Sequence, residues 1–362
     1  MNFYFLLINK ILNSYSNNYK DNIDHLRFKK EKYKISIPTK INLLNSNGYY
    51  HNIQIAQILK EFELTYGEYL NNMVETFDKL EDEVSQYIYI DLILYRFLGN
   101  NKVKLETIKD LRDKYINIID KYYDKNDIIL SNDQNLNFYK HKFEYNNYTI
   151  QLYLNERGPL NAFYLGQYRI NDICVTNDDI VIDCGACYGD TTIEFATRLN
   201  NKGKVLCYEF IPKTLEILEN NISLNNALKD KIQIVRNACW SESKKKLYYQ
   251  DNGPGSRVEF EKFEKYEGEV ETLSIDDLVY QNKLEKVDFI KMDIEGAEPH
   301  ALKGAIKTIS KYRPKLAISI YHNMNDFSSI LPWINSLRLG YVFYIRHFTI
   351  HSGETVLYCI SK

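Results

Sequence analysis

Three acidic residues in this sequence each follow a short apolar run, at the position where a buried strand would end. Asp183 follows residues 180–182, Glu209 follows residues 205–208, and Asp293 closes a third run. A carboxylate can accept hydrogen bonds from two vicinal hydroxyls, balance a cation or accept a proton. Because the carboxyl ends of neighbouring parallel strands meet at one edge of a sheet, these acids predict a single site with binding and proton-transfer chemistry.

The segment after Asp183 has the composition of a ligand-binding turn. Gly185 and Gly189 mark the turn, and a helical pattern begins at Asp190. Backbone N–H groups at such a turn lie close to a bound ligand. The Gly-x-x-x-Gly spacing differs from the dinucleotide fingerprint, whose middle glycine makes room for a pyrophosphate. An acid ahead of the turn suits a ligand with an ammonium or sulfonium group, and S-adenosylmethionine carries both.

Glu209 adds a second part to this pattern. It lies 19 residues after Asp190, at the end of the next predicted strand. In nucleotide-binding α/β units an acid at this place accepts hydrogen bonds from ribose hydroxyls. A lone strand-end acid is simply a solvated residue in roughly half of all cases. The order and spacing of the turn and Glu209 together favour an adenosyl ligand.

A third block, residues 291–298 with the sequence Lys-Met-Asp-Ile-Glu-Gly-Ala-Glu, resembles the hallmark of the FkbM-type methyltransferases. The turn at residues 181–191 and the Leu-Ser-Ile-Asp-Asp-Leu run at 273–278 resemble that family as well, and the likeness covers about residues 165 to 362. The resemblance implies a class I S-adenosylmethionine-dependent methyltransferase. It also implies an acceptor that is usually a hydroxyl of a sugar or natural product.

The predicted site combines the turn with the strand ends. The expected cofactor-binding residues are Asp183, Gly185, Ala186, Tyr188, Gly189, Asp190, Thr191, Glu209, Phe210, Asn237, Ala238 and Asp293. Asp293 is the first choice for a base or hydroxyl orienter. His322 follows a later strand, and an imidazole pKa of about 6.5 suits proton transfer at neutral pH. Glu295 is either a third catalytic carboxylate or a cap of the next helix, and no metal is predicted because two ligands do not make a metal site.

Beyond residue 168 the pattern alternates between strand and helix, which is typical of a mostly parallel sheet covered on both faces. Strands are predicted at 179–183, 204–209, 232–236, 287–293, 314–321, 341–346 and 355–361, and helices at 190–200, 212–226, 296–311 and 326–339. The expected fold is α/β: a class I methyltransferase (Rossmann-like) seven-stranded, mostly parallel sheet in residues 158–362.

Residues 1–157 are predicted to form a mainly helical N-terminal domain. Apolar residues recur at helical spacing over 53–99 and over 105–123, and alternation within 124–150 indicates a small hairpin. These helical faces carry too many apolar positions to stay solvated. We expect them to pack on the catalytic domain and limit acceptor access, with a homodimer as the alternative.

Composition restricts the classes of partner and compartment. The formal net charge of −2 over 362 residues gives no electrostatic footprint for nucleic acid. Cys184 and Cys187 form a C-x-x-C, but no second such motif accompanies it, so we interpret them as small buried residues in a reducing cytoplasm. The apolar run at residues 3–8 is too short for a membrane span or a signal peptide.

The leading hypothesis is a cytoplasmic O-methyltransferase that acts on a sugar, glycan or glycoconjugate precursor. N-methylation of an amino-sugar or amino-acid substituent is the enzymatic alternative, because an amine attacks in its neutral form and depends less on a base. A cofactor-binding interaction module is the non-enzymatic alternative, and the intact acids disfavour it. The missing middle glycine disfavours a nicotinamide oxidoreductase.

Overall fold

The computed structural model of the chain describes residues 1–14, 17, 19, 22, 55–105, 115–121, 123–130, 137–251 and 255–362. The chain groups into two compact units. The first consists of Met1–Lys109, Ile320–Arg338 and Val342–Leu357, and the second of Asp110–Ser319, Leu339–Tyr341 and Tyr358–Lys362. This grouping does not follow the boundary expected at residue 157, which stays a prediction.

The first unit is built mainly from helices in its described part: α1 (Phe3–Ser14), α2 (Ile55–Tyr66), α3 (Leu70–Lys79), α4 (Glu83–Leu98) and α11 (Met324–Ser336), with the short turn η1 (Gly67–Tyr69). The helical pattern expected over 53–99 is thus divided into three helices. Asp82 separates two of them because its side chain accepts a hydrogen bond from Ser85 N and caps α4. In the stretch 105–123, residues 115–119 are helical, and 106–114 and 122 lie outside the described residues.

Contacts between distant segments hold this first unit together. Thr76 Oγ1 donates to Ser328 O at 3.1 Å, so α3 is fixed to α11. The Tyr89 and Phe327 rings stack with their centroids 4.6 Å apart, which fixes α4 to the same helix. Residues 320–338 therefore pack with the N-terminal helices although they follow the last parallel strand in the sequence.

A seven-stranded sheet has the order β13-β14-β12-β11-β4-β5-β6. Its strands are β4 (Ile180–Cys184), β5 (Lys204–Tyr208), β6 (Ile232–Val235), β11 (Phe289–Met292), β12 (Lys315–Ser319), β13 (Tyr341–His347) and β14 (Thr355–Ser361). The contiguous pairs from β12 to β6 are all parallel. Their continuous apolar runs follow from burial on both faces, because a parallel sheet is covered by helices on each side.

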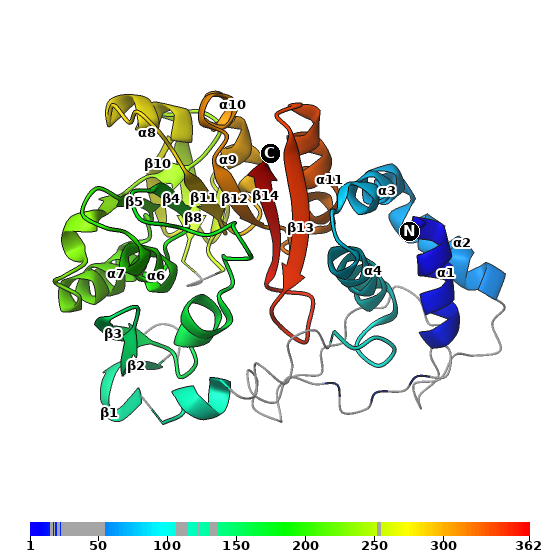
Figure 1. Cartoon of the computed structure of the whole chain (residues 1–362), viewed down its shortest axis with the longest axis horizontal. Helices are drawn as coiled ribbons and strands as arrows, with labels where there is room; N and C mark the ends of the chain where they lie inside the picture. The colour runs from blue at the N-terminus through cyan, green and yellow to red at the C-terminus, as the bar shows by residue number, and fades with distance from the viewer. Residues whose placement is uncertain are drawn as a thin grey trace. The chain divides into compact units, whose positions relative to one another are not determined.

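Helices cover both faces of this sheet within the second unit (Figure 1). On one side lie α6 (Asp190–Arg198) and α7 (Pro212–Leu224), and on the other α8 (Ile275–Gln281), α9 (Glu298–Lys303) and α10 (Ile306–Tyr312). A π-helix, η2 (Leu160–Leu165), and a short 3-10 helix, η3 (Lys229–Lys231), also belong to this unit. The single helix expected at 296–311 is wrong: α9 ends before Gly304, where a Cβ would lie 2.1 Å from Trp240 O. The close approach of that carbonyl requires glycine. The helix breaks there because Gly304 O accepts from Asp276 N, and the Asp276 carboxylate accepts from the N–H groups of Lys307 and Thr308 in the first turn of α10.

Two smaller sheets flank the main one. The first has the order β1-β2-β3, formed by β1 (Tyr123–Leu130), β2 (Asn137–Tyr145) and β3 (Tyr148–Leu154), so the expected hairpin gains a third strand. Asn146 and Asn147 turn the β2–β3 hairpin with φ of 47° and 64°, a left-handed pair that asparagine tolerates. The second sheet has the order β7-β10-β8-β9, formed by β7 (Ala238–Cys239), β10 (Gly268–Leu273), β8 (Lys246–Gln250) and β9 (Arg257–Glu259).

Side chains of α7 complete the edge of β3. Asn221 accepts from Tyr153 N at 2.7 Å and donates to Tyr153 O at 3.1 Å, and Asn225 makes the same pair of bonds with Gln151 at 3.1 and 2.7 Å. Residues four apart on a helix thus match residues two apart on a strand, and the amides replace a neighbouring strand. The β1–β3 sheet is thereby fixed to the helix that follows Glu209.

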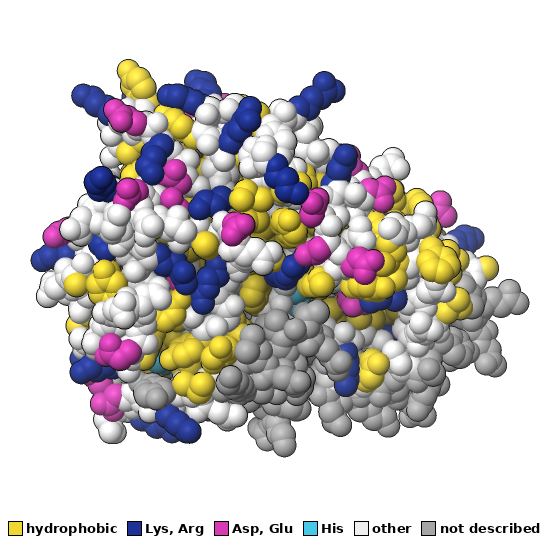
Figure 2. Space-filling model, viewed as in Figure 1, with side chains coloured by type: hydrophobic (Ala, Val, Ile, Leu, Met, Phe, Trp, Pro, Cys, Tyr) yellow, Lys and Arg dark blue, Asp and Glu magenta, His cyan; other side chains and the backbone are white. Residues whose placement is uncertain are grey.

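Two features of the described residues bear on charge and on membrane crossing. On the face drawn in Figure 2, Lys and Arg side chains are interspersed with Asp and Glu, without a large field of one sign. Among the described residues, no helix has both the length and the apolar character that crossing a membrane would require.

Candidate cofactor-binding and catalytic site

The turn between β4 and α6 has three residues in the left-handed region: Gly185 (φ 86°), Cys187 (φ 48°) and Gly189 (φ 88°). A Cβ on Gly185 would lie 2.0 Å from Asp293 O, and one on Gly189 would lie 2.6 Å from Leu218 Cδ1. Both glycines are therefore required by conformation and by space. The strand-turn-helix expected from the sequence is confirmed, and its backbone packs directly on the residue that follows β11.

The Asp183 carboxylate is fully buried and already has partners within the protein. It accepts from Thr192 Oγ1 at 2.6 Å and from Thr191 Oγ1 at 3.2 Å, which ties the end of β4 to the first turn of α6. Lys291 Nζ lies 3.0 Å from Asp183 Oδ1. The negative charge at Asp183 is thus balanced from inside the fold, and a direct contact between Asp183 and a cofactor stays a prediction.

Lys291 is a residue of this site that the sequence did not predict. Its side chain is 2% exposed, and its ammonium donates to Gly185 O at 2.6 Å and to Cys184 O at 3.2 Å. Burial lowers the pKa of Lys291, but the carboxylates of Asp183 and Asp293 outweigh this effect and hold that pKa above its usual value. A lysine inside the otherwise apolar strand β11 was the sequence signal that could have singled it out.

Glu209 connects the end of β5 to the same turn. Its carboxylate accepts from Cys187 N at 3.1 Å and from the backbone N–H groups of Phe210 and Ile211 at 2.7 and 2.9 Å. Burial raises the pKa of Glu209 to about 6, although these backbone bonds oppose the shift. A carboxylate so fixed is oriented before any ligand arrives, as a ribose-binding acid requires.

Asp190 begins α6 and is a second acid with a raised pKa. Burial raises the pKa of Asp190 to about 6, while the Lys291 ammonium works against the shift. A carboxylate in the first turn of a helix is stabilised by the helix dipole. Thr191, next to it, is buried and directs its hydroxyl to Asp183.

Apolar residues from three strand ends meet beside Glu209. Phe210 follows β5 and Ile294 follows β11, and both pack against a cluster that contains Ala238 and Trp240. Asn237, which precedes Ala238, donates from Nδ2 to Glu271 O at 3.1 Å. A flat apolar ring could lie against such a surface, and Trp240 is a member that the sequence reasoning missed.

Two predicted residues of the turn point into the protein. Ala186 is fully buried. The Tyr188 ring contacts Phe138 of β2 edge-on with centroids 4.8 Å apart, and its carbonyl accepts from Asn221 Nδ2 at 2.8 Å. Tyr188 therefore fixes the turn to the small β1–β3 sheet, and a contact of its side chain with cofactor stays a prediction.

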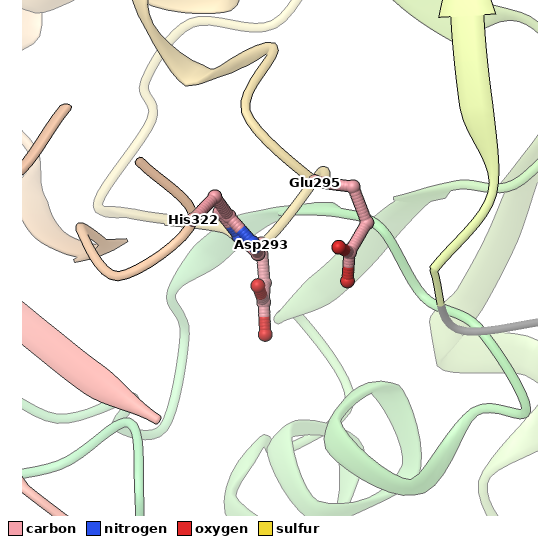
Figure 3. Close-up of side chains that lie close together, drawn as sticks. All are labelled: Asp293, Glu295 and His322. Atoms are coloured by element: carbon pink, nitrogen blue, oxygen red, sulfur yellow. The ribbon is translucent and has the colours of Figure 1, made fainter. Parts of the chain in front are cut away.

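Asp293 and Glu295 lie on the segment that follows β11, and Figure 3 shows their carboxylates pointing to the same side of it. One carboxylate oxygen of each lies within 4.8 Å of the other. Tyr168 OH donates to Asp293 Oδ2 at 2.7 Å, and this orienting tyrosine was not found from the sequence. Glu295 has a left-handed backbone with φ of 57°, a costly conformation that is common at functional sites.

Glu298 has a structural role in the fold, whereas the role of His322 stays a prediction. Glu298 is fully buried and accepts from Ile294 N at 2.8 Å, so it supports the backbone ahead of α9. His322 comes three residues after the end of β12 and groups with the first unit. Its proposed partnership with Asp293 stays a prediction.

The comparisons with known proteins agree with this geometry. Residues 183–343 match the family model for the methyltransferase FkbM domain. The chain carries an FkbM methyltransferase domain. No curated protein matches the chain.

One solved structure carries the fold assignment. The crystal structure of methyltransferase FkbM from Methylobacillus flagellatus KT matches with a TM-score of 0.52 at 18% identity, covering 82% of this chain and 60% of that one. An O-methyltransferase from Bacillus cereus in complex with SAH matches at 17% identity with a TM-score of 0.35, over 51% and 74% of the two chains. The FkbM methyltransferase domain of this chain has the class I methyltransferase fold, and the expected fold class is confirmed.

Proposed function

We propose that this chain is an S-adenosylmethionine-dependent methyltransferase that methylates a hydroxyl of a sugar, glycan or glycoconjugate precursor. One observation carries the proposal: the Gly185–Gly189 turn, Glu209 and Asp293 converge at the carboxyl ends of adjacent parallel strands of a class I methyltransferase fold. In open α/β sheets ligands bind at this edge.

The residues at this edge suit an adenosyl cofactor. Glu209 would accept the ribose hydroxyls, since its carboxylate is held by Cys187 N and by its own following backbone. Phe210 and Ala238 would offer an apolar surface for the base. S-adenosylmethionine supplies a methyl group on a sulfonium, which makes that carbon electrophilic. Asp190 and Asp293 are the remaining acids that could face the positive charge.

Asp293 is our candidate for accepting the proton of the acceptor hydroxyl. A hydroxyl attacks well only when its proton is taken up, and a carboxylate within hydrogen-bond reach performs this step. The Tyr168 hydroxyl orients Asp293 through one carboxylate oxygen, and in this role the other oxygen would face the substrate. Glu295, whose carboxylate lies within 4.8 Å, is the second acid that could serve. His322 stays a proposed base.

N-methylation is the closest alternative, because a neutral amine needs less help from a base. The two reactions make different predictions for Asp293→Asn: methylation of a hydroxyl should be nearly abolished, whereas methylation of an amine should only weaken. A binding module without catalysis would retain the cofactor and transfer no methyl group.

The compartment that we propose is the reducing cytoplasm. None of the six cysteines forms a disulfide, in keeping with this compartment.

Calorimetry with S-adenosylmethionine, S-adenosylhomocysteine and NADH tests the cofactor. We expect dissociation constants in the low micromolar range for the first two, which corresponds to roughly −8 kcal/mol. Binding of NADH without either adenosyl compound would overturn the proposal. Radiolabelled S-adenosylmethionine incubated with the purified chain and glycan extracts then tests the acceptor class, with Asp293→Asn as the comparison.

A further inference from the structure

Lys291 lies in the centre of the parallel sheet, where a charged side chain is unusual. Its neighbours in β11 are Phe289, Ile290 and Met292, all fully buried. Lys291 pairs in register with Asp183 of β4, so the two side chains leave the sheet on the same face. The ion pair between them is almost completely shielded from solvent, with 2% and 0% of the two side chains exposed.

The ammonium of Lys291 reaches beyond Asp183 to the turn itself. It donates to the carbonyls of Gly185 and Cys184 at 2.6 and 3.2 Å, so it holds the two residues with which the chain leaves the strand. On its other side it lies 5.3 Å from the centre of the Tyr168 ring, whose hydroxyl binds Asp293. The Lys291 ammonium therefore contacts the end of β4, the turn that follows it, and Tyr168, whose hydroxyl orients the candidate base Asp293.

A buried ion pair is a poor way to gain stability. Removing two charges from water costs several kcal/mol per ion, and apolar residues of similar volume are often as stable or more so. A methionine at position 291 and an asparagine at 183 would fill nearly the same space. What they would lose is the hold on the turn carbonyls, because methionine has no donor.

We propose that Lys291 is a positioning residue for cofactor binding: its ammonium holds the carbonyls of Cys184 and Gly185 and so fixes the turn that receives S-adenosylmethionine. The inference rests on the proposed function. It assigns the turn's geometry to a side chain from a different strand, so that β11 organises both the cofactor turn and Asp293.

The test compares Asp183→Asn with the double variant Asp183→Asn/Lys291→Met. Both lack the Asp183 charge. They differ in position 291, where lysine keeps an ammonium that holds the carbonyls and methionine has neither the charge nor a donor. We expect S-adenosylhomocysteine, measured by calorimetry, to bind about tenfold more weakly to the double variant than to Asp183→Asn. The thermal midpoint of the double variant should be no lower than that of Asp183→Asn, because it leaves no buried charge without its partner, so weaker binding by the double variant would not reflect a loss of stability.

A second pair supplies the matched control. Lys315 and Asp179 also form a lysine–aspartate pair, and Lys315 also donates to a backbone carbonyl, that of Cys174 at 2.7 Å. They lie at the amino ends of β12 and β4. The double variant Asp179→Asn/Lys315→Met should bind S-adenosylhomocysteine within about twofold of the wild type, because the side chains that orient the cofactor turn are not disturbed there.

Each outcome has one meaning. Equal affinity of Asp183→Asn and Asp183→Asn/Lys291→Met would overturn the role of Lys291. If the methionine double variant does not fold, Asp183→Asn/Lys291→Gln replaces it: a glutamine side chain is shorter than lysine and uncharged, so it should hold the turn carbonyls more weakly and affinity should fall between the two extremes. Affinity equal to that of Asp183→Asn would again overturn the inference. A wild-type chain that does not bind S-adenosylhomocysteine would instead overturn the proposed function.

Discussion

The two ends of strand β4 carry the same chemistry in different surroundings. At the carboxyl end Asp183 binds Lys291 and the hydroxyls of Thr191 and Thr192. At the amino end Asp179 binds Lys315 and accepts from both the N–H and the hydroxyl of Thr176. In both places the lysine also donates to backbone carbonyls.

Burial separates the two pairs. The carboxyl-end pair is 2% and 0% exposed, whereas the side chains of Lys315 and Asp179 are 20% and 12% exposed. Water screens the amino-end pair and can replace a lost partner, but it cannot do so at the carboxyl end. The same residue types thus close a loop at one edge of the sheet, and at the other edge they contact the turn that we propose to bind the cofactor.

The largest expected effect is on the free energy of unfolding, when the lysine of each pair is replaced by methionine. Lys291→Met alone leaves the Asp183 carboxylate buried without a cation, and we expect the free energy of unfolding to fall by about 3–5 kcal/mol. Lys315→Met should cost only about 1 kcal/mol, because its partner is partly hydrated. Urea denaturation followed by circular dichroism measures both. Equal losses of unfolding free energy in the two variants would contradict the proposed difference between the two ion pairs.

Glu209 sharpens the comparison at the level of binding. Glu209→Ala removes the proposed ribose acceptor and releases the N–H of Cys187, so S-adenosylhomocysteine should bind more weakly by about 2–3 kcal/mol. Calorimetry measures the change, with the exposed Glu219→Ala, which loses only its ion pair with Arg236, as the control. If a folded Glu209→Ala protein binds S-adenosylhomocysteine with wild-type affinity, Glu209 does not bind the ribose.

Tyr168→Phe probes the connection from Lys291 to Asp293 without changing packing. The loss of the hydroxyl removes one hydrogen bond to the Asp293 carboxylate, which we expect to slow methyl transfer by about tenfold, or about 1.4 kcal/mol. Affinity for S-adenosylhomocysteine should stay within about twofold. Tyr341→Phe, whose hydroxyl bonds Pro314 O, is the matched control and should leave the rate unchanged. A rate loss of the same size in both variants would argue against a role for Tyr168 at the site.

The smallest effect is a pH dependence confined to the carboxyl edge. The pKa of Glu209 and that of Asp190 are both raised to about 6, mainly by burial. Because these folded pKa values exceed the unfolded ones, the two groups stabilise the native state when protonated, and this contribution is lost as pH rises from about 4 to about 6. Cofactor affinity should run the other way and increase as pH rises through about 6, since ionised Glu209 is the better acceptor. Calorimetry at pH 5 and pH 7.5 would show this, and equal affinity at both values would contradict it.

Much of this protein could be predicted from local sequence. The apolar runs located the parallel strands, because a strand buried on both faces must be continuously apolar. Gly185 and Gly189 located the turn, since no other residue fits their left-handed backbone and close contacts. The resemblance of residues 291–298 to the FkbM-type methyltransferases predicted the FkbM methyltransferase domain, whose family model matches residues 183–343.

The rest depended on contacts between residues far apart in the chain. The single helix expected at 296–311 is two helices because Asp276, 28 residues before Gly304, bonds Gly304 O and caps the first turn of α10, a contact that no periodicity reveals. The sequence by itself determined where the strands, the turn and the acids lie, because burial and backbone conformation are encoded locally. Only the tertiary structure decided that the charge of Asp183 is balanced by Lys291 and that Asp293 is held by Tyr168. Those partners are 108 and 125 residues apart: strand register brings Lys291 to Asp183, and the turn that carries Tyr168 meets Asp293 only in the folded chain.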